Sequence, residues 1–139
     1  MKNLLILIFI LITINNIKAQ DKLSSRDGKT FGWHKNGRGY FTGDAYDLSS
    51  KNTCCWVENG TIYDANGTPS NSTSYEIVGF YENGKIYTYA SPSSNERKFV
   101  GSYRNGELYN KNGKFIAYYE GDEKAAAVAG FVLLIVFEY

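Results

Sequence analysis

The sequence predicts an all-β fold made of repeated β-hairpins, and three observations support this prediction. A nine-residue frame recurs at intervals of 22 to 24 residues, at 32–40, 55–63, 79–87 and 101–109. Each copy carries Asn-Gly at its centre between β-branched and aromatic residues, which is the strongest short-range signal for a hairpin with a type I′ turn. The chain ends in an apolar run at 125–137. We therefore expect β-hairpins around a pseudo-fourfold axis, with this C-terminal apolar segment in the core.

Residues 1–19 have the features of a secretory signal peptide rather than of a folded element. A lysine near the start is followed by an apolar stretch at 4–14, and Ala19 is the small residue before the expected cleavage point. We expect cleavage after Ala19 and a protein that is secreted or resides in the periplasm or cell envelope. The remaining chain divides into an N-terminal segment with the first hairpin, 20–42, and a hairpin-repeat domain, 43–139.

The charge of the chain excludes one class of partner. Cleavage of the signal peptide removes two lysines and no acid, which leaves 13 basic and 14 acidic residues. Proteins that bind nucleic acid neutralise its phosphates with a surplus of lysine and arginine. Nucleic acid is therefore not an expected partner.

The turns between the copies of the frame also follow from the sequence. Second Asn-Gly pairs at 66–67 and 112–113 predict that the chain reverses again after two of the copies. A longer polar loop at 91–95 takes the place of this turn in the third copy. A fifth, decayed copy at 117–121 keeps the small residue and the turn glycine but lacks the Asn and the final Tyr. The result is a meander of short strands.

The register of the first copy is ambiguous. The pattern Gly-x-apolar-Tyr-Asp occurs at 43–47 as well as at 60–64. Either Tyr40 or Tyr46 is therefore the counterpart of Tyr63.

The C-terminal run is too short to cross a bilayer. Its thirteen residues span about 20 Å as a helix, whereas a crossing needs about 20 residues. Residues 131–137 are rich in β-branched side chains and suit a strand buried on both faces, and 125–129 suit a short helical turn. We place the run on the axis of the hairpins. A run that engages lipid without spanning the membrane is the alternative.

The two cysteines are adjacent, at positions 54 and 55. Successive side chains of a strand point to opposite faces, which separates the sulfurs and argues against a disulfide between them. The frame places Cys55 in the slot of Gly32, Gly79 and Gly101, and Cys54 in an apolar slot. Both thiols are therefore expected to be packing residues, with a vicinal redox pair or an intermolecular bridge as the alternatives.

No catalytic or metal-binding pattern is found. His34 is the only histidine, no cysteine or second histidine lies at ligand spacing, and we expect it on the surface. Asp44, Asp47 and Asp64 suggest an acidic cluster, but they lack the spacing of a calcium-binding loop and suit turn capping. We expect no metal, no cofactor and no enzymatic activity. A cleft that gathers His34 with two carboxylates would instead indicate an enzyme.

The aromatic residues give the candidate binding surface. We assign one row to Trp33, Trp56, Tyr81 and Tyr103, and a second row to Tyr40, Tyr63, Tyr87 and Tyr109. Cross-strand packing within each hairpin explains both rows. The functional interpretation is that the first row is exposed and stacks on sugars or holds a partner protein.

The chain resembles the 4-fold β-flower family. The resemblance covers about residues 43–137 and is carried by three features: the Gly-x-Ile/Leu-Tyr units, the apolar-Val-Gly units ending at Gly79 and Gly101, and the Ala-rich, then Leu/Ile/Val-rich tail. It implies four hairpin petals around a pseudo-fourfold axis and no assigned activity. MORN repeats are a weaker match, because they share the period near 23 and the aromatic-x-Asn-Gly turn but have a later Gly-x-Gly that this chain lacks.

These observations together predict a secreted, non-enzymatic β-repeat protein. Its expected role is that of a binding module or a structural part of the cell envelope, with a protein or a glycan as partner. The alternative is a small envelope-associated protein that engages lipid through 125–137. Full enclosure of that run by the hairpins, or a protein that is soluble without detergent, would remove this alternative.

Overall fold

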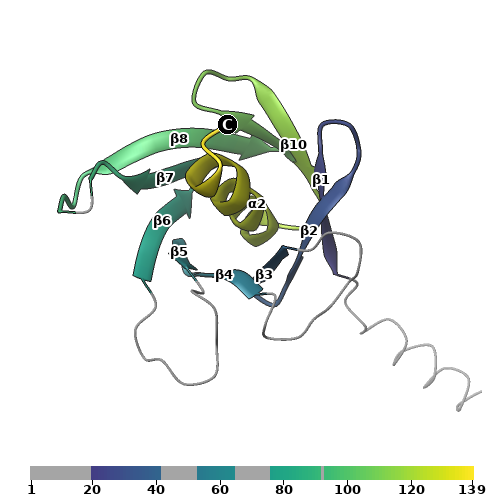
Figure 1. The fold of residues 1–139 in the computed structure, drawn as a ribbon, viewed down its shortest axis with the longest axis horizontal. Helices are drawn as coiled ribbons and strands as arrows, with labels where there is room; N and C mark the ends of the chain where they lie inside the picture. The colour runs from purple at the N-terminus through teal and green to yellow at the C-terminus, as the bar shows by residue number, and fades with distance from the viewer. Residues whose placement is uncertain (1–19, 42–52, 65–75, 92) are drawn as a thin grey trace, which may run out of the picture.

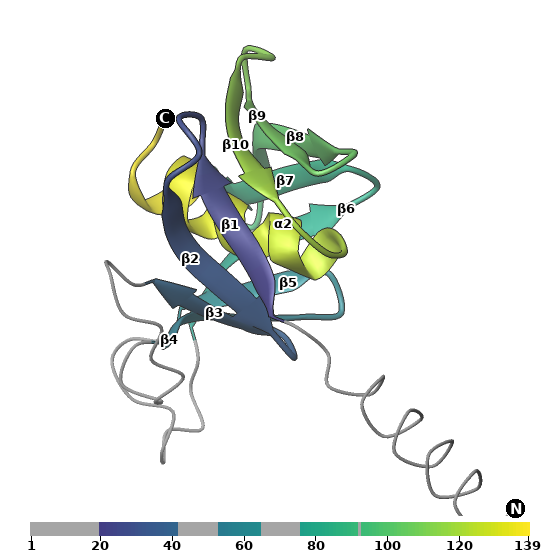
Figure 2. The same cartoon turned by 90° about the vertical axis from the view of Figure 1, so that its right-hand side faces the viewer.

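The computed structural model describes residues 20–41, 53–64, 76–91 and 93–139. They form one closed antiparallel barrel of ten strands around a C-terminal helix (Figures 1 and 2). Each strand pairs with its neighbours in the chain, and the first strand closes the barrel against the last. The strands are β1 (Asp21–Ser25), β2 (Thr30–Lys35), β3 (Arg38–Phe41), β4 (Thr53–Glu58), β5 (Thr61–Asp64), β6 (Glu76–Glu82), β7 (Lys85–Tyr89), β8 (Arg97–Arg104), β9 (Glu107–Asn110) and β10 (Phe115–Tyr119). The predicted all-β class with repeated hairpins is confirmed.

The four Asn-Gly turns lie at one rim of the barrel, which we call the turn rim. Their asparagines have φ between 48° and 51° and the following glycines have φ between 76° and 81°. Positive φ at both central residues defines the type I′ turn, whose twist matches that of the flanking strands. The hairpins β2–β3, β4–β5, β6–β7 and β8–β9 therefore form where the sequence predicts them.

The β1–β2, β7–β8 and β9–β10 connections lie at the opposite rim, which we call the mouth. In the β9–β10 turn the Gly113 amide donates to the Asn110 carbonyl at 2.9 Å, and in the β1–β2 turn the Gly28 amide donates to the Ser25 carbonyl at the same distance. The loop at 91–95 joins β7 to β8, as expected, and is closed by a hydrogen bond from the Ala90 amide to the Glu96 carbonyl (2.8 Å). The Asn-Gly pair at 66–67 lies outside the described residues.

The decayed fifth copy completes its hairpin with the strand from the other end of the chain. Leu23 of β1 pairs with Tyr119 of β10, just as Ile86 pairs with Tyr81 within a continuous hairpin. After β10 the chain enters the helix instead of turning back into another strand. The fifth copy therefore lacks the Asn of the type I′ turn and the Tyr of the strand that follows it in the other copies. The barrel therefore contains five hairpin units rather than the four expected around the axis.

The pairing also settles the register of the first copy. Trp33 pairs with Tyr40 in β2–β3, and Trp56 pairs with Tyr63 in β4–β5. Tyr40 is therefore the counterpart of Tyr63. The three strands of segment 20–42 belong to the same barrel as the later hairpins.

A β-bulge recurs at the same position in all five units. At each bulge the pairing with the preceding strand skips one residue, and the five skipped residues are Phe31, Cys54, Val78, Val100 and Ile116. A bulge breaks the alternation of faces and re-aims a side chain. All five skipped side chains pack against the core. This explains why an apolar residue directly precedes the Gly, Ala or Cys of each copy, since both positions face inward.

The small slot after each bulge makes room for the neighbouring strand and for the helix. The pairs across this layer join a large aliphatic residue to a small one: Leu23 to Gly32, Ile62 to Gly79, Ile86 to Gly101 and Leu108 to Ala117. A Cβ at Gly101 would lie 2.3 Å from the Tyr109 carbonyl oxygen and 2.5 Å from Leu134 Cδ1. In the fifth pair the sizes are reversed, and Gly39 faces Cys55.

The C-terminal run is helical as far as Val136. Helix α2 (Glu123–Gly130) continues into the π-helical segment η2 (Phe131–Val136), and together they fill the barrel interior (Figure 1). The β-branched residues of 131–137 suit a strand, but Phe131–Val136 are helical. The ten strands already pair with one another, so a strand inside the barrel would leave its backbone groups without partners, whereas a helix satisfies its own.

Burial of the run bears on the lipid alternative. Residues 125–132 and Leu134 are buried, whereas Val136 and Phe137 are each 54% exposed. The hairpins therefore enclose most of the run, and only its end lies outside. Within the described residues, no helix combines the length and apolar character needed to cross a bilayer.

Candidate functional site

The four residues of the first aromatic row do not share a surface. Trp33 and Trp56 occupy the second position of the frame and are half-buried, whereas Tyr81 and Tyr103 occupy the third position and are buried. Successive positions of a strand face opposite sides of the sheet. The two tryptophans therefore lie on the outside of the barrel and the two tyrosines inside it. The structure does not bring these four residues together as one binding surface.

The inward tyrosines surround the start of α2. Burial raises the pKa of Tyr81, Tyr103 and Tyr119, and for Tyr103 burial together with the negative charge of Glu123 raises it to about 12. The Tyr103 hydroxyl lies 3.4 Å from Glu123 Oε2, to which it donates a hydrogen bond. The rings of Tyr103 and Tyr119 meet edge to face, with centroids 6.3 Å apart. A raised pKa keeps each phenol protonated, and the Tyr103 hydroxyl uses its proton to donate to Glu123.

His34 takes the place of these tyrosines in the first hairpin and is buried, not on the surface as expected. The third position of the frame points into the barrel, and the His34 side chain is only 5% exposed. Its Nδ1 lies 2.7 Å from Asp21 Oδ2, and its Nε2 accepts a hydrogen bond from the Gly37 amide at 3.1 Å. Asp122, which caps α2 by accepting from the Lys124 amide, completes the group, and the potential ligand atoms of the three side chains lie within 4.8 Å of one another.

The hydrogen bonds of His34 restrict what this group can do. Because Nε2 accepts from an amide, the ring proton is on Nδ1, which donates to Asp21. A histidine that binds a metal uses one nitrogen for the metal and donates with the other, but here neither nitrogen is available. The hollow beside the group measures about 150 Å³, and its lining offers no hydroxyl or thiol nucleophile; it consists of Asp21, His34, Lys35, Asn36, Gly37, Asp122 and Lys124.

His34 does lie close to two carboxylates, which is the arrangement that we named as an indication of an enzyme. The hydrogen bonds of His34, however, do not support a role in acid–base catalysis. A general base must reach the proton that it removes, and Nε2 is already held by the turn. The Asp21–His34 hydrogen bond instead joins β1 to β2, and this pair lies beside Asp122 at the start of α2. Sequence reasoning missed Asp21 and Asp122 as partners, although the inward direction of the third frame position was available as a signal.

The two cysteines lie on the same side of β4, which overturns the expectation of opposite faces. Cys54 is the bulge residue of its unit, and the sulfurs are 3.7 Å apart. Both thiols are free, and Cys55 is fully buried. Burial raises the pKa of the Cys55 thiol. Of the suggested acidic cluster, Asp44 and Asp47 lie outside the described residues, and Asp64 pairs with Glu76 and Cys55 in the sheet.

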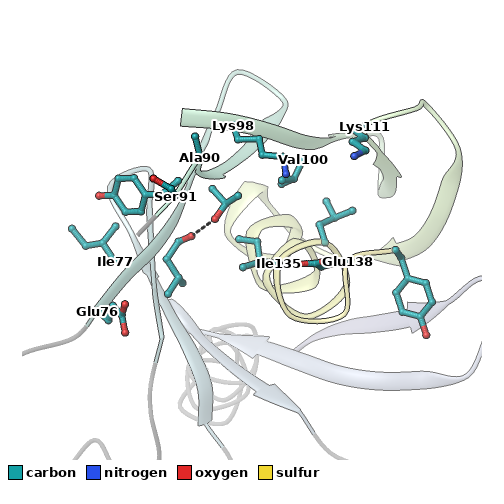
Figure 3. A pocket seen from close by; sticks show the side chains of 14 residues that line it. Glu76, Ile77, Ala90, Ser91, Lys98, Val100, Lys111, Ile135 and Glu138 are labelled. Atoms are coloured by element: carbon teal, nitrogen blue, oxygen red, sulfur yellow. Dashed lines mark hydrogen bonds between the residues drawn. The ribbon is translucent and has the colours of Figure 1, made fainter. Parts of the chain in front are cut away.

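A larger hollow of about 460 Å³ opens at the mouth, beside the end of η2 (Figure 3). Its apolar lining includes Val78 and Val100, which are bulge residues, together with Leu134 and Ile135 of η2. Its charged residues are balanced. Lys98 and Lys111 lie near Val100, whereas Glu76 lies across the hollow beside Ile77 and Glu138 lies next to Ile135. The Thr88 hydroxyl in this lining already donates to the Val78 carbonyl at 2.9 Å.

A second hollow of about 550 Å³ lies on the other side of the β9–β10 turn. Figure 2 shows the β1–β2 and β9–β10 turns on the same side of the barrel as the C-terminus. The lining consists of Ser25, Arg26, Asp27, Lys114, Phe115, Ile116, Leu133 and Tyr139. Tyr139, which is 67% exposed, lines both hollows. The two hollows therefore share a wall.

Protein-family models, curated proteins and solved structures all give no match to this chain. The function must therefore be argued from the site. Two features favour the mouth over the turn rim. Its hollows are three or more times larger than the hollow beside His34, and exposed apolar side chains gather there, including Ile77, Val136 and Tyr139.

Proposed function

We propose that the protein is a secreted, non-enzymatic binding module that holds a small, partly apolar ligand at the barrel mouth. The observation that carries this proposal is the pair of hollows, about 460 and 550 Å³, on either side of one helix end. Small-molecule sites typically measure roughly 300–1,000 Å³ and are lined mainly by apolar side chains with a few polar groups. The helix fills the barrel interior, so the ligand binds beside the helix end rather than on the axis.

The fold supplies a rigid frame for such a site. A closed barrel has no free sheet edges, and the recurrent bulges turn Val78, Val100 and Ile116 toward the helix, where they line the hollows. The residues that line each hollow come from separate hairpins. Sites built on rigid elements hold their geometry better than sites on free loops.

The lining favours recognition over catalysis. The Ser25 hydroxyl is engaged by the Asp27 side chain and the Lys29 carbonyl, and the Thr88 hydroxyl is engaged by Val78. Neither hollow includes a histidine or a cysteine in its lining. A nucleophile needs an adjacent base, and the described lining provides no such pair.

The neutral fluorophore N-phenylnaphthylamine tests this proposal. We expect saturable binding to the mature protein. Tyr139→Ala removes the shared wall and should weaken binding several-fold, and Ala90→Trp, at an exposed position of the first hollow, should reduce the bound amount. Lys85→Trp at the turn rim is the control and should change neither. Thermal denaturation checks that each variant folds. Absence of binding to the wild type, or equal binding by all variants, rules out the mouth as the site.

A further inference from the structure

We infer that the hollow between the β1–β2 and β9–β10 turns binds an amphipathic anion. The apolar body of the ligand would lie on Phe115, Ile116 and Leu133, with its acidic head, a carboxylate, sulfonate or phosphate, between Arg26 and Lys114. This inference rests on the proposed function and names the ligand class for one of the two hollows.

The apolar part of this hollow is held by packing. Ile116 is the bulge residue of its unit, and it packs against the core together with Leu133 of η2. The Phe115 ring lies between two tyrosines, with its centroid 6.1 Å from that of Tyr109 and 4.7 Å from that of Tyr118. These contacts keep an apolar floor in place without a ligand.

The charged side chains of this hollow are mainly positive. Arg26 and Lys114 line it from two neighbouring turns, and the acidic groups in its described lining are the Asp27 side chain and the main-chain carboxylate of Tyr139. The Asp27 carboxylate is already occupied: it interacts with the Ser25 hydroxyl and with Lys29 Nζ at 3.4 Å. Hydrogen bonds from Ser25 and from the Lys29 backbone lower the pKa of Asp27, so it stays charged and bound to these partners.

Among the described residues, Arg26 and Lys114 form no ion pair with a side chain. The ion pairs among the described residues are Lys29 with Asp27 and Arg97 with Glu82, and the contact of His34 with Asp21 is the hydrogen bond described above. Two cations above an apolar floor therefore complement an anion that carries an apolar body. Arginine and lysine bind carboxylate and phosphate groups through charge-assisted hydrogen bonds.

The first hollow serves as an internal comparison. Its lysines, Lys98 and Lys111, are matched by Glu76 and Glu138 in the same lining. It has no surplus of positive charge and gives no reason to prefer an anion. The structure therefore assigns the anion to the hollow of Arg26 and Lys114 alone.

A pair of matched fluorophores tests the inference. Anilinonaphthalene sulfonate has the ring system of N-phenylnaphthylamine with an added sulfonate. We expect it to bind more tightly than the neutral compound and to lose affinity as salt is added, because salt screens exposed charges. Decanoate should displace it, whereas decanol and inorganic sulfate should not, because each of them lacks either the charge or the apolar body.

Variants locate the charge. The double variant Arg26→Met and Lys114→Met keeps two long side chains without their charges, and it should weaken the sulfonate about tenfold, which corresponds to about 1.4 kcal/mol. The neutral compound should bind as before. Lys85→Met at the turn rim makes the same change at a distance and should have no effect.

The two proposals fail in different ways. Equal affinity for both fluorophores, or an unchanged sulfonate affinity in the double variant, overturns the anion assignment and leaves the binding module in place. Displacement by inorganic sulfate alone shows a simple anion site and also overturns it. If neither fluorophore binds, the proposed function itself is wrong.

Discussion

The buried tyrosines at the turn rim make the stability of the barrel depend on pH in the alkaline range. Burial, and then the charge of Glu123, raises the pKa of Tyr103 to about 12, whereas a tyrosine in an unfolded chain ionises at about pH 10. The folded state therefore holds this proton more strongly than the unfolded state. The stability that results is fully present below pH 10 and is lost as the pH rises toward 12.

We expect the free energy of unfolding to fall between about pH 10 and pH 12. Urea denaturation at a series of pH values measures this change. Tyr103→Phe removes the titrating group and should make the dependence less steep. Tyr118→Phe, at a residue that is 45% exposed, is the control and should leave the slope as it is. An identical slope in wild type and Tyr103→Phe would contradict the assignment.

Cys54 and Cys55 form a side-by-side dithiol because a bulge turns Cys54 inward, and their sulfurs are 3.7 Å apart. A reagent that bridges two neighbouring thiols, such as phenylarsine oxide, should therefore be retained by the pair, and its reaction with the folded protein should be slow because Cys55 is fully buried and burial raises the pKa of its thiol. Mass spectrometry of the adduct measures this. Cys54→Ser and Cys55→Ala each leave one thiol and should not retain the reagent. Retention of the arsenical by either single variant would show that the pair is not the site.

At the scale of the element, the bulge and the small residue after it act as one unit. Gly101 shows the constraint most clearly, because an added Cβ meets the Tyr109 carbonyl oxygen at 2.3 Å and Leu134 at 2.5 Å. A backbone oxygen cannot move aside as a flexible side chain can, so the strand itself must shift. This is overpacking of a closed layer.

We expect Gly101→Ala to lower the free energy of unfolding by about 1–3 kcal/mol. Ser102→Ala, at the adjacent half-buried position of the outer face, should change it by no more than about 0.5 kcal/mol. Chemical denaturation of the two variants gives both values. Equal stability of the two variants would mean that the slot is looser than the structure shows.

The start of α2 depends on its cap. Asp122 Oδ1 accepts a hydrogen bond from the Lys124 amide at 2.9 Å. Asp122→Ala should cost about 1 kcal/mol of stability, as loss of an N-cap usually does. Asp122→Asn keeps the acceptor and should cost much less. If Asn is as costly as Ala in thermal denaturation, then the charge of Asp122 beside Asp21 and His34 matters, and the cap does not.

Local signals in the sequence predict some elements of this fold and miss others. The Asn-Gly turns are predicted because positive φ at both positions is a property of the residues themselves. The helix at 131–137 is missed because β-branched residues favour strands, and only the closed ladder around the run makes a strand there impossible. The bulges are missed as well, so the two cysteines are assigned to opposite faces. The aromatic row mixes inner and outer positions for a different reason, because it combines second and third positions of the frame.

The site follows the same division. The alignment of the frames places His34 at the position of the inward-facing Tyr81 and Tyr103. Burial of His34 could therefore have been predicted from the sequence. Its contact with Asp21 could not, because β1 pairs with β2 at a register that the frame does not describe. The mouth hollows depend on where η2 ends relative to the bulge residues Val78, Val100 and Ile116. That relation exists only once the barrel has closed.

At the scale of the whole molecule, closure of the barrel joins the two ends of the described chain. β10 supplies the first half of the fifth unit and β1 supplies the second half. The fifth unit has no turn of its own, so β1 is held by its ladder hydrogen bonds and by its side chains. Leu23 carries most of this contact, because it is fully buried in the slot that Leu108 occupies in the preceding unit.

Leu23→Ala and Leu108→Ala therefore test whether the β1–β10 pairing that closes the barrel is as stable as a hairpin whose strands are joined by a turn. Both residues are fully buried, and each substitution should cost about 2–4 kcal/mol of unfolding free energy through lost burial and the cavity left behind. We expect the two costs to agree within about 1 kcal/mol, since the residues occupy equivalent slots and the spread among similar sites is of that order. Chemical denaturation measures both. A cost for Leu23 that is far below that for Leu108 would show that β1 detaches before the barrel unfolds, and the four remaining hairpins would then hold the helix without it.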